Sequence, residues 1–410
     1  MPRSIIVPNS ANTIYDEHKF RTVVRASGGR LWVVYSQWDN VPACYQIFCA
    51  YSDDDGVNWV GHTQLTTDID DQVVPCIAID STDNLYVVWQ GLGVGTFPAR
   101  SQIRYIKRTS GVGWGAIQNL TDVNFNQYRP RIAVGSTDDI YVVWQGQGWG
   151  VNPNRNNIQF LHTVGGAWQA QEDVTDINQH QYSPAVAVDG GDIIYVVWSG
   201  KGWGVNVGWD NIQYRSRIAG VWQAQEPVTD ITGWFVNGQL EPAIGIGLLG
   251  NIHVVWSGYG WDGDAEWERI RYRRRTAGVW GAVEHISSGF PFPAFTPRDR
   301  RPSISIAQSG DIYVFWNTRN VVDIRYRKES TGVWGLETIL YADPTGWGSY
   351  NVVARHSYHP IVGGFHTNIL TDGFNVTWDE DGGRELDFFV PAPAVPFVVN
   401  KSYALSREEL

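Results

Sequence analysis

The sequence is poor in cysteine, lysine and methionine, with three, five and one of these residues in 410. Three cysteines (Cys44, Cys49 and Cys76) are too few for the disulfide framework of a small secreted domain. Neither a CxxC pair nor a cysteine–histidine cluster occurs, which argues against a structural zinc site. The acidic segments DIDDQ, WDGD and DEDGG match no complete calcium-loop pattern. We therefore expect no metal and no cofactor.

Long hydrophobic runs and an excess of positive charge are also missing. No stretch of about 18 apolar residues occurs, so we expect no membrane insertion. The net charge of −11 argues against a nucleic-acid partner, because phosphate binding needs a concentrated basic surface. The segment MPRSIIVPNSAN lacks the apolar core of a signal peptide. An extracellular or particle-surface location is our expectation, and a cytoplasmic one stays open.

Tryptophan and glycine are abundant, and they recur in a repeated phrase. VVWQGQGWGVN (142–152) is followed by VVWSGKGWGVN (196–206) and VVWSGYGWDGD (254–264). Seven copies align, centred on Tyr35, Trp89, Trp144, Trp198, Trp256, Trp316 and Trp378. In five copies a proline lies 14 residues earlier, at Pro75, Pro130, Pro184, Pro242 and Pro302. Units of this length in a fixed register are typical of repeat architectures.

Each repeat predicts four short strands. The first follows a Pro-x-apolar-small-apolar pattern such as PRIAV, and the second is a nearly continuous apolar run such as IYVVW. The third alternates, as in NIQYRSR, and the fourth starts at a Gly-x-Trp turn. We therefore predict an all-β fold, a seven-bladed β-propeller with four-stranded antiparallel blades, as a single domain over residues 1–410.

The two chain ends predict how the propeller closes. The segment SIIVP (4–8) occupies the position of a fourth strand that no blade precedes. We expect it to complete the last blade beside PIVGG, FNVTW and LDFFV. An alternative closure uses FVVNKSY near the C-terminus. Either pairing would protect the open edge of the last sheet.

The repeated phrase divides into a core part and a loop part. Its VVW is predicted to fill the space between neighbouring sheets, whereas GQGWGVN and its equivalents form loops on one face. Tryptophan faces flanked by amides and carboxylates are typical of carbohydrate sites. An alternative is that these tryptophans pack loop against loop. The candidate ligand-binding residues are Trp149, Asn152, Trp203, Asn206, Trp209, Asp210, Trp261, Asp262 and Trp267.

A second candidate site is formed by the residue just before each proline, at the mouth of the axial channel. Around the ring it reads Phe20, Val74, Arg129, Ser183, Glu241, Arg301 and His359. Arg129 and Arg301 are candidates to bind an anion, and Glu241 and His359 are candidates for acid–base chemistry. Alternatively, the unlike charges neutralise one another across a wet channel.

The stretch SDDDGVNW fits the Ser-x-Asp-x-Gly-x-x-Trp pattern of the Asp-box, or BNR, repeat at Ser52, Asp54, Gly56 and Trp59. The sequence therefore resembles the sialidase-like Asp-box propellers. Sialidases of this group use three arginines, an acid Asp and a Tyr–Glu pair. The resemblance implies roles for Arg21, Asp39, Arg129 and Arg301, while no motif marks a Tyr–Glu pair and the group has six blades.

Three functions follow from these observations. The first is a non-catalytic, lectin-like propeller on a viral or secreted particle, with a glycan partner, because several weak sites together give avidity. The second is a glycoside hydrolase or polysaccharide lyase at the channel mouth, with the candidates Asp39, Glu241, Arg301, Tyr358 and His359. In the hydrolase, Glu241 would pair with Asp39 or Asp299. The third is a platform for a protein partner.

Overall fold

The computed structural model of the chain describes residues 3–7, 22–231, 238–247, 249–260, 268–287, 298–307, 309–319, 323–342, 353–354, 376–380 and 385–389. Strands and turns make up this part, and the described residues contain no helix. It follows that none of them belongs to a helix of the length and apolarity needed to cross a membrane.

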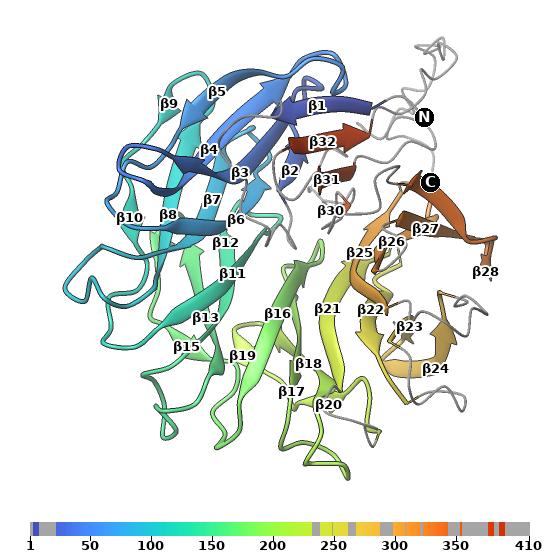
Figure 1. Cartoon of the computed structure of the whole chain (residues 1–410). Coiled ribbons are helices and arrows are strands. Elements are labelled where there is room, and N and C mark those ends of the chain that lie inside the picture. The colour runs from blue at the N-terminus through green and yellow to red at the C-terminus, as the bar shows by residue number, and fades with distance from the viewer. Residues whose placement is uncertain are drawn as a thin grey trace, which may run out of the picture.

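The strands of the described residues form seven antiparallel sheets, which we number in chain order (Figure 1). Sheet 1 contains β2 (Val23–Arg25), β3 (Leu31–Asp39), β4 (Cys44–Ser52) and β5 (Val60–Gln64). Sheet 2 contains β6 (Gln72–Ile79), β7 (Leu85–Gly91), β8 (Gln102–Thr109), β9 (Gly113–Trp114) and β10 (Gln118–Asn119). Sheet 3 contains β11 (Gln127–Val134), β12 (Ile140–Gly146), β13 (Asn157–Val164), β14 (Ala167–Trp168) and β15 (Glu172–Asp173).

The next three sheets repeat this order. Sheet 4 contains β16 (Gln181–Val188), β17 (Ile194–Gly200), β18 (Asn211–Ile218), β19 (Val221–Trp222) and β20 (Glu226–Pro227). Sheet 5 contains β21 (Gln239–Ile246), β22 (Ile252–Gly258), β23 (Arg269–Thr276) and β24 (Val279–His285). Sheet 6 contains β25 (Arg298–Ile306), β26 (Ile312–Arg319), β27 (Asp323–Ser330), β28 (Val333–Trp334) and β29 (Thr338–Ala342).

The last sheet joins the two ends of the chain. It contains β30 (Val353–Ala354), β31 (Val376–Glu380), β32 (Glu385–Phe389) and the N-terminal strand β1 (Arg3–Val7). The antiparallel pairing of β1 with β32 confirms the predicted closure by the N-terminal strand. The inner position is taken by β30, whereas the predicted strand PIVGG (360–364) and the alternative FVVNKSY (397–403) lie outside the described residues.

The sheets are arranged around a common centre, with the first strands β11, β16, β21 and β25 nearest to it (Figure 1). Neighbouring first strands contact each other, so each sheet packs face to face on the next. The predicted all-β propeller of antiparallel sheets is therefore confirmed. Sheets 1 and 5 and the last sheet have four strands, whereas in sheets 2, 3, 4 and 6 two short strands take the place of the predicted fourth strand. The core of the propeller lies between the sheets, where apolar second strands such as β12 and β17 are buried on both sides.

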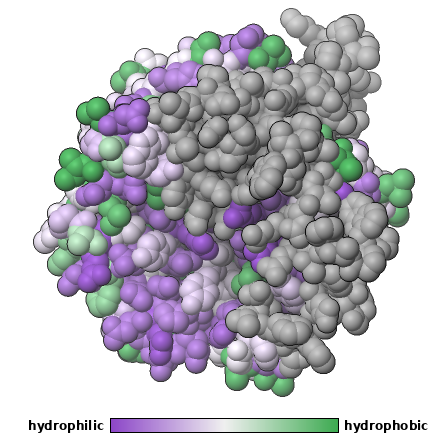
Figure 2. All heavy atoms as spheres, viewed as in Figure 1, coloured by the Kyte–Doolittle hydropathy of each residue, from purple (hydrophilic) through white to green (hydrophobic). Residues whose placement is uncertain are grey.

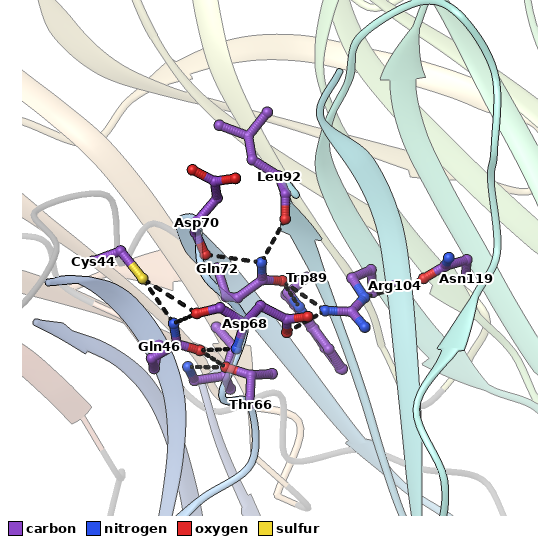
Figure 3. Close-up of polar contacts among 11 residues, drawn as sticks. Cys44, Gln46, Thr66, Asp68, Asp70, Gln72, Trp89, Leu92, Arg104 and Asn119 are labelled. Carbon is purple, nitrogen blue, oxygen red and sulfur yellow. Dashed lines mark hydrogen bonds and ion pairs between the residues drawn. The ribbon is translucent and has the colours of Figure 1, made fainter. Parts of the chain in front are cut away.

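The repeated tryptophans belong to this core, as predicted. Trp89, Trp144, Trp198, Trp256 and Trp316 are all 0% exposed. In sheet 2 the indole Nε1 of Trp89 donates to Oε1 of Gln72 at 2.9 Å, and Nε2 of Gln72 donates to the backbone oxygens of Asp70 and Leu92 (Figure 3). The side-chain amide of Gln72 thus accepts the hydrogen bond of the buried indole and links two loops to the strand ends by its own hydrogen bonds.

The glycine two residues after Trp89, Trp144, Trp198 and Trp256 has a packing reason. A Cβ atom on Gly146 would lie 1.7 Å from Oε1 of Gln127, which accepts the hydrogen bond of Trp144. The same clash would arise at Gly91, Gly200 and Gly258. The VVWxG part of the phrase is therefore explained by the core alone. The three cysteines are buried free thiols, so no Cys44–Cys49 disulfide forms.

Candidate functional site

The loops between second and third strands share one face with the connections from fourth to first strands. In sheet 3 the carboxylate of Asp176, in the latter connection, accepts hydrogen bonds from the backbone N–H groups of Val151 (2.7 Å) and Asn152 (3.0 Å). Asp230 holds Val205 and Asn206 in the same way in sheet 4. The long loops of sheets 3 and 4 on this face, which we call the loop face, are therefore each held in place by an aspartate.

The turn carrying the Asp-box pattern lies on the opposite face. Ser52 Oγ accepts from the N–H of Gly56 at 2.8 Å, and Asp54 accepts from the N–H of Asn58 at 2.8 Å. The indole of Trp59 donates to the oxygen of Gly56 at 3.1 Å. These contacts complete a tight turn between β4 and β5, and they give the pattern an architectural role.

Several predicted ligand residues of the loop face contact the scaffold. The side-chain amides of Asn152 and Asn206 donate to Asp176 and Asp230, each at 3.0 Å. Trp149 meets Trp144 edge-on with ring centres 5.8 Å apart, and Trp203 Nε1 lies 3.3 Å from Gln181 Oε1. These contacts anchor the loops and leave the rings half-buried.

The remaining predicted residues of this face have different positions. Trp209 and Asp210 are half-buried next to the start of β18, and Lys201 Nζ lies 3.8 Å from Asp210 Oδ2. Burial raises the pKa of Asp210, while the charge of Lys201 opposes that shift. Trp261, Asp262 and Trp267 lie outside the described residues, as do Tyr358 and His359. Ligand binding by all of these residues stays a prediction.

The ring of residues before the prolines coincides with a repeated β-bulge. The register of each first strand shifts at this point, and the bulged residue has a left-handed backbone. The φ angles are 60° for Val74, 54° for Arg129, 50° for Ser183, 54° for Glu241 and 55° for Arg301. Five non-glycine residues with positive φ at one repeat position indicate a conserved device of the fold, since such angles are uncommon.

Two pairs of neighbours in this ring are in contact. Arg129 Nη1 donates to Ser183 Oγ at 2.9 Å, and the backbone N–H of Arg301 donates to Glu241 Oε2 at 3.2 Å. The backbone N–H groups of Arg129 and Ser183 donate to Gln90 and Gln145 of the preceding sheets. The bulge therefore holds polar residues of neighbouring first strands in contact, at the repeat position that the sequence analysis singled out. Anion binding or acid–base chemistry at this position stays a prediction.

A buried polar cluster lies between sheets 5 and 6, and the sequence analysis missed it. Tyr259 follows β22, Glu268 precedes β23, and Arg300 lies on β25. The hydroxyl of Tyr259 donates to Glu268 Oε2 at 3.0 Å, and Arg300 Nε donates to the same oxygen. The side chain of Glu268 is 1% exposed and that of Arg300 is 28% exposed, so Arg300 is the member nearest to solvent.

Electrostatics sets the Glu268 carboxylate apart from an ordinary surface glutamate. Burial raises the pKa of Glu268, Arg300 opposes this shift, and the charge of Glu241 adds to it. The cluster therefore lies close to the ring residue Glu241, whose carboxylate contacts Arg301. A buried carboxylate with a hydroxyl and a guanidinium is equipped to accept and return a proton.

Comparison of repeat positions would have found this cluster. The residue three places after the core tryptophan is Leu92, Gln147, Lys201 and then Tyr259. The residue before the third strand is Ser101, Asn156, Asp210 and then Glu268. The signal is the change from neutral side chains in sheets 2 and 3 to ionisable ones in sheets 4 and 5.

Two carboxylates proposed as partners of Glu241 are occupied by scaffold contacts. Asp39 accepts from the N–H of Val41 at 3.1 Å and from Gln64 Nε2 at 2.9 Å. Asp299 is 4% exposed, accepts from Thr318 Oγ1 at 2.8 Å and lies 3.6 Å from Arg269. Both carboxylates therefore help to hold neighbouring strands together.

Comparisons with known proteins show what the chain resembles in sequence and in fold. No protein-family model matches the sequence, and no curated protein matches it significantly. An ulvan lyase of polysaccharide lyase family PL25, bound to -[GlcA(1-4)Rha3S]-, superposes with a TM-score of 0.63 at 12% identity, covering 95% of this chain and 96% of the lyase.

Two further structures resemble the chain less closely. The polysaccharide lyase Uly1 gives a TM-score of 0.50 at 11% identity over 93% of this chain and 90% of that protein. The GH93 alpha-L-arabinofuranosidase of Fusarium graminearum, in complex with arabinobiose, gives 0.51 at 14% identity over 77% and 92%. The chain thus has a β-propeller fold that is similar to those of these carbohydrate-active enzymes.

Proposed function

We propose that the chain is an enzyme that cleaves an acidic polysaccharide on its loop face, between sheets 5 and 6. The contact of Tyr259 and Arg300 with one oxygen of the buried Glu268 is the observation that carries this proposal. The likeness in fold to a lyase solved with a GlcA-containing fragment supports it. A polymeric substrate also supports the predicted location outside the cell or on a particle surface.

The cluster fits β-elimination next to a uronate. In that reaction the C5–H bond and the C4–O bond break, a C4=C5 double bond forms, and the C5 proton must reach the leaving oxygen. The hydroxyl of Tyr259 can take the C5 proton while it passes its own proton to Glu268, and can return it to the leaving oxygen. The raised pKa of Glu268 favours this uptake, since the protonated carboxyl is less costly in a buried site.

Arginine side chains supply the positive charge that elimination requires. Negative charge accumulates on the uronate carboxylate as the C5 proton leaves, and fixed cations stabilise it. Arg300 is partly exposed beside Glu268, and Arg301 is the next residue on the same strand. Arg300 keeps N–H groups beyond the Nε that contacts Glu268, because a guanidinium has five donors.

Hydrolysis is the second candidate, because the carboxylates of Glu241 and Glu268 lie close enough to interact. The charge of Glu241 contributes to the raised pKa of Glu268. Two carboxyl groups in one site are the usual equipment of a glycosidase, with one as acid and the other as base or nucleophile.

The lectin prediction loses part of its support. Trp149, Trp203, Asn152 and Asn206 have partners in the scaffold, so their repetition has a structural explanation. A protein platform also gains little, because on the face shown in Figure 2 the hydrophobic residues of the described surface are scattered at the periphery, around a hydrophilic centre.

Incubation with uronate-containing polysaccharides tests the proposal. We expect new reducing ends together with the ultraviolet absorbance of an unsaturated uronate. Reducing ends without that absorbance would identify the hydrolase. If neither signal appears with any acidic polymer, the proposed function is wrong, and a glycan array then tests the lectin.

A further inference from the structure

One repeat position carries buried polar atoms that the protein itself does not satisfy. Ser101, Asn156 and Asp210 each precede the third strand of sheets 2, 3 and 4. Ser101 Oγ, Asn156 Oδ1 and Asp210 Oδ1 are buried and have no hydrogen-bond partner among the residues that the structure describes. At the equivalent position of sheet 5, Glu268 is bound by Tyr259 and Arg300.

Such atoms are costly, and their recurrence therefore calls for a reason. An unsatisfied buried acceptor has lost its hydrogen bonds to water without a replacement, and folded proteins keep few such atoms. Three unsatisfied acceptors at the same position of successive sheets indicate a shared cause, because an isolated packing defect would affect one sheet only. The backbone at this position is well held: the oxygen of Asn156 accepts from the N–H of Gln181, and that of Asp210 from the N–H of Gln239.

The chemistry of the three side chains defines their ligand. The Asn156 oxygen and an ionised Asp210 only accept hydrogen bonds, and Ser101 can both accept and donate. The matching partner is therefore a donor without negative charge. Sugar hydroxyl groups meet this requirement, whereas a uronate or sulfate group would be repelled by Asp210.

Aromatic side chains flank the same positions. Tyr128 and Tyr182 lie half-buried on the first strands of sheets 3 and 4, and His180 stacks on Tyr182 with ring centres 5.8 Å apart. His180 Nε2 lies 3.4 Å from Arg155 Nη1. Burial raises the pKa of Tyr182, and the charges of Asp210 and Arg155 act on it in opposite directions, so Tyr182 lies near both. Ring faces of this kind pack against the C–H faces of sugars.

We propose that Ser101, Asn156 and Asp210 form a row of subsites for sugar hydroxyl groups, which we call the hydroxyl row. It binds the part of the polysaccharide that extends from Glu268 across sheets 4, 3 and 2. This inference rests on the proposed function and adds to it the direction of the bound polymer. It also assigns uncharged, hydroxyl-rich units to the row and the acidic unit to the arginines of sheet 6.

Oligosaccharides of increasing length, prepared from the polymer that the full chain cleaves, test the row. Asn156→Ala and Asp210→Ala should raise KM for long oligosaccharides by about three- to thirtyfold, the range for losing a hydrogen bond to a neutral or charged group. KM for the shortest cleaved oligosaccharide should change less than about twofold, because that substrate does not reach the row. Asp210→Asn, which retains an acceptor oxygen, should recover most of the affinity.

Asp192→Ala is the matched control, because it makes the same chemical change as Asp210→Ala in the turn between β16 and β17 on the opposite face. It should show no dependence on oligosaccharide length. An equal change in KM at every oligosaccharide length, or no change at any length, would overturn the proposed hydroxyl row and leave the proposed function intact. If the unmodified chain cleaves none of the uronate-containing polysaccharides, the proposed function fails. Calorimetric measurement of the binding of each intact polysaccharide then tests the hydroxyl row. Weaker binding by both Asn156→Ala and Asp210→Ala supports the row, and equal or no binding overturns it.

Discussion

The indole Nε1 of Trp198 donates to Oε1 of Gln181 at 2.8 Å, and both residues are fully buried. The same amide donates from Nε2 to the backbone oxygens of Gln179 and Lys201. One glutamine therefore joins the core of sheet 4 to both loops above it. This arrangement recurs at Gln72, Gln127 and Gln239, so the rigid loop face is built from the core upwards.

Gln181→Leu should lower the free energy of unfolding by about 3 kcal/mol. The change leaves the indole N–H and two backbone oxygens without a partner, and each buried group costs about 1–3 kcal/mol. Chemical denaturation followed by tryptophan fluorescence measures the loss. Gln179→Leu, the same change at an exposed neighbour, is the control and should cost less than about 0.5 kcal/mol. Equal losses in the two variants would contradict the role of the amide.

A buried histidine should make sheet 5 sensitive to acid. His253 is 4% exposed, and its Nδ1 lies 2.6 Å from Tyr272 Oη. Burial, followed by the charge of Arg274, lowers the pKa of His253 to about 3, whereas an unfolded histidine titrates near 6.5. The unfolded state thus takes up a proton that the folded state excludes. Stability is therefore fully present above pH ~6.5 and lost as the pH falls, by up to about 1.4 kcal/mol per unit.

His253→Tyr should reduce this acid sensitivity. Tyrosine is the residue of the neighbouring repeats, at Tyr86, Tyr141, Tyr195 and Tyr313, and it stays neutral. Between pH 7 and pH 5 the variant should lose about 2 kcal/mol less than the unmodified chain. Urea denaturation at both pH values gives the difference. An unchanged dependence on pH would show that His253 is protonated in the folded protein.

The fold could be predicted from the sequence because each repeat carries its own strand signals in a fixed register. Fourteen-residue spacing from proline to tryptophan fixes the first two strands, and the Gly-x-Trp turn fixes the last. The same register singled out the residue before each proline, whereas the β-bulge at that position was found only in the structure. The cluster of Tyr259, Glu268 and Arg300 did not follow from the register, because its members come from a strand end, a loop end and the next sheet. The folded register alone brings these side chains to one oxygen atom.

In the tryptophan loops, repetition has a structural explanation that the sequence did not reveal. Trp149 and Trp203 looked like repeated ligand residues because glycine-rich loops have no visible anchor in a sequence. In the structure these rings and the amides of Asn152 and Asn206 supply the anchors. A side chain that recurs in every repeat indicates a structural contact that each sheet requires. A side chain that departs from the repeat, such as Glu268, indicates a role specific to one sheet.

A contact between Asp192 and Ser136 links sheets 3 and 4 on the face opposite to the site, and it gives a prediction for stability. Asp192 accepts from the backbone N–H of Ser136 at 2.6 Å and from its hydroxyl at 2.8 Å, with a φ of 57°. Asp192→Ala should lower stability by about 2 kcal/mol, through lost hydrogen bonds and a strained left-handed backbone. Asp192→Gly loses the bonds without the strain and should cost about 1 kcal/mol less. Thermal unfolding compares them, and a glycine variant no more stable than alanine would contradict the strain.

The strongest prediction concerns turnover at the proposed site. Tyr259→Phe removes the hydroxyl that contacts Glu268 and should lower kcat by about 10²- to 10⁴-fold, the usual worth of acid–base catalysis. Glu268→Gln should lower kcat similarly, because an amide cannot take up the proton. In the unmodified enzyme, activity should fall as the pH drops below the raised pKa of Glu268, since uptake needs the ionised form.

Tyr195→Phe is the matched control for the loss of a buried hydroxyl, because Tyr195 donates to Asp189 at 2.7 Å away from the cluster. It should lower the melting temperature slightly and leave kcat within about twofold. The two tyrosine variants are compared on one uronate polymer, with the absorbance of the unsaturated product as the measure of rate. Equal rates in both variants would remove Tyr259 from the mechanism. A lost rate in Tyr259→Phe, with a melting temperature lowered no more than in Tyr195→Phe, would place proton transfer at this hydroxyl, because a larger structural defect would lower the melting temperature further.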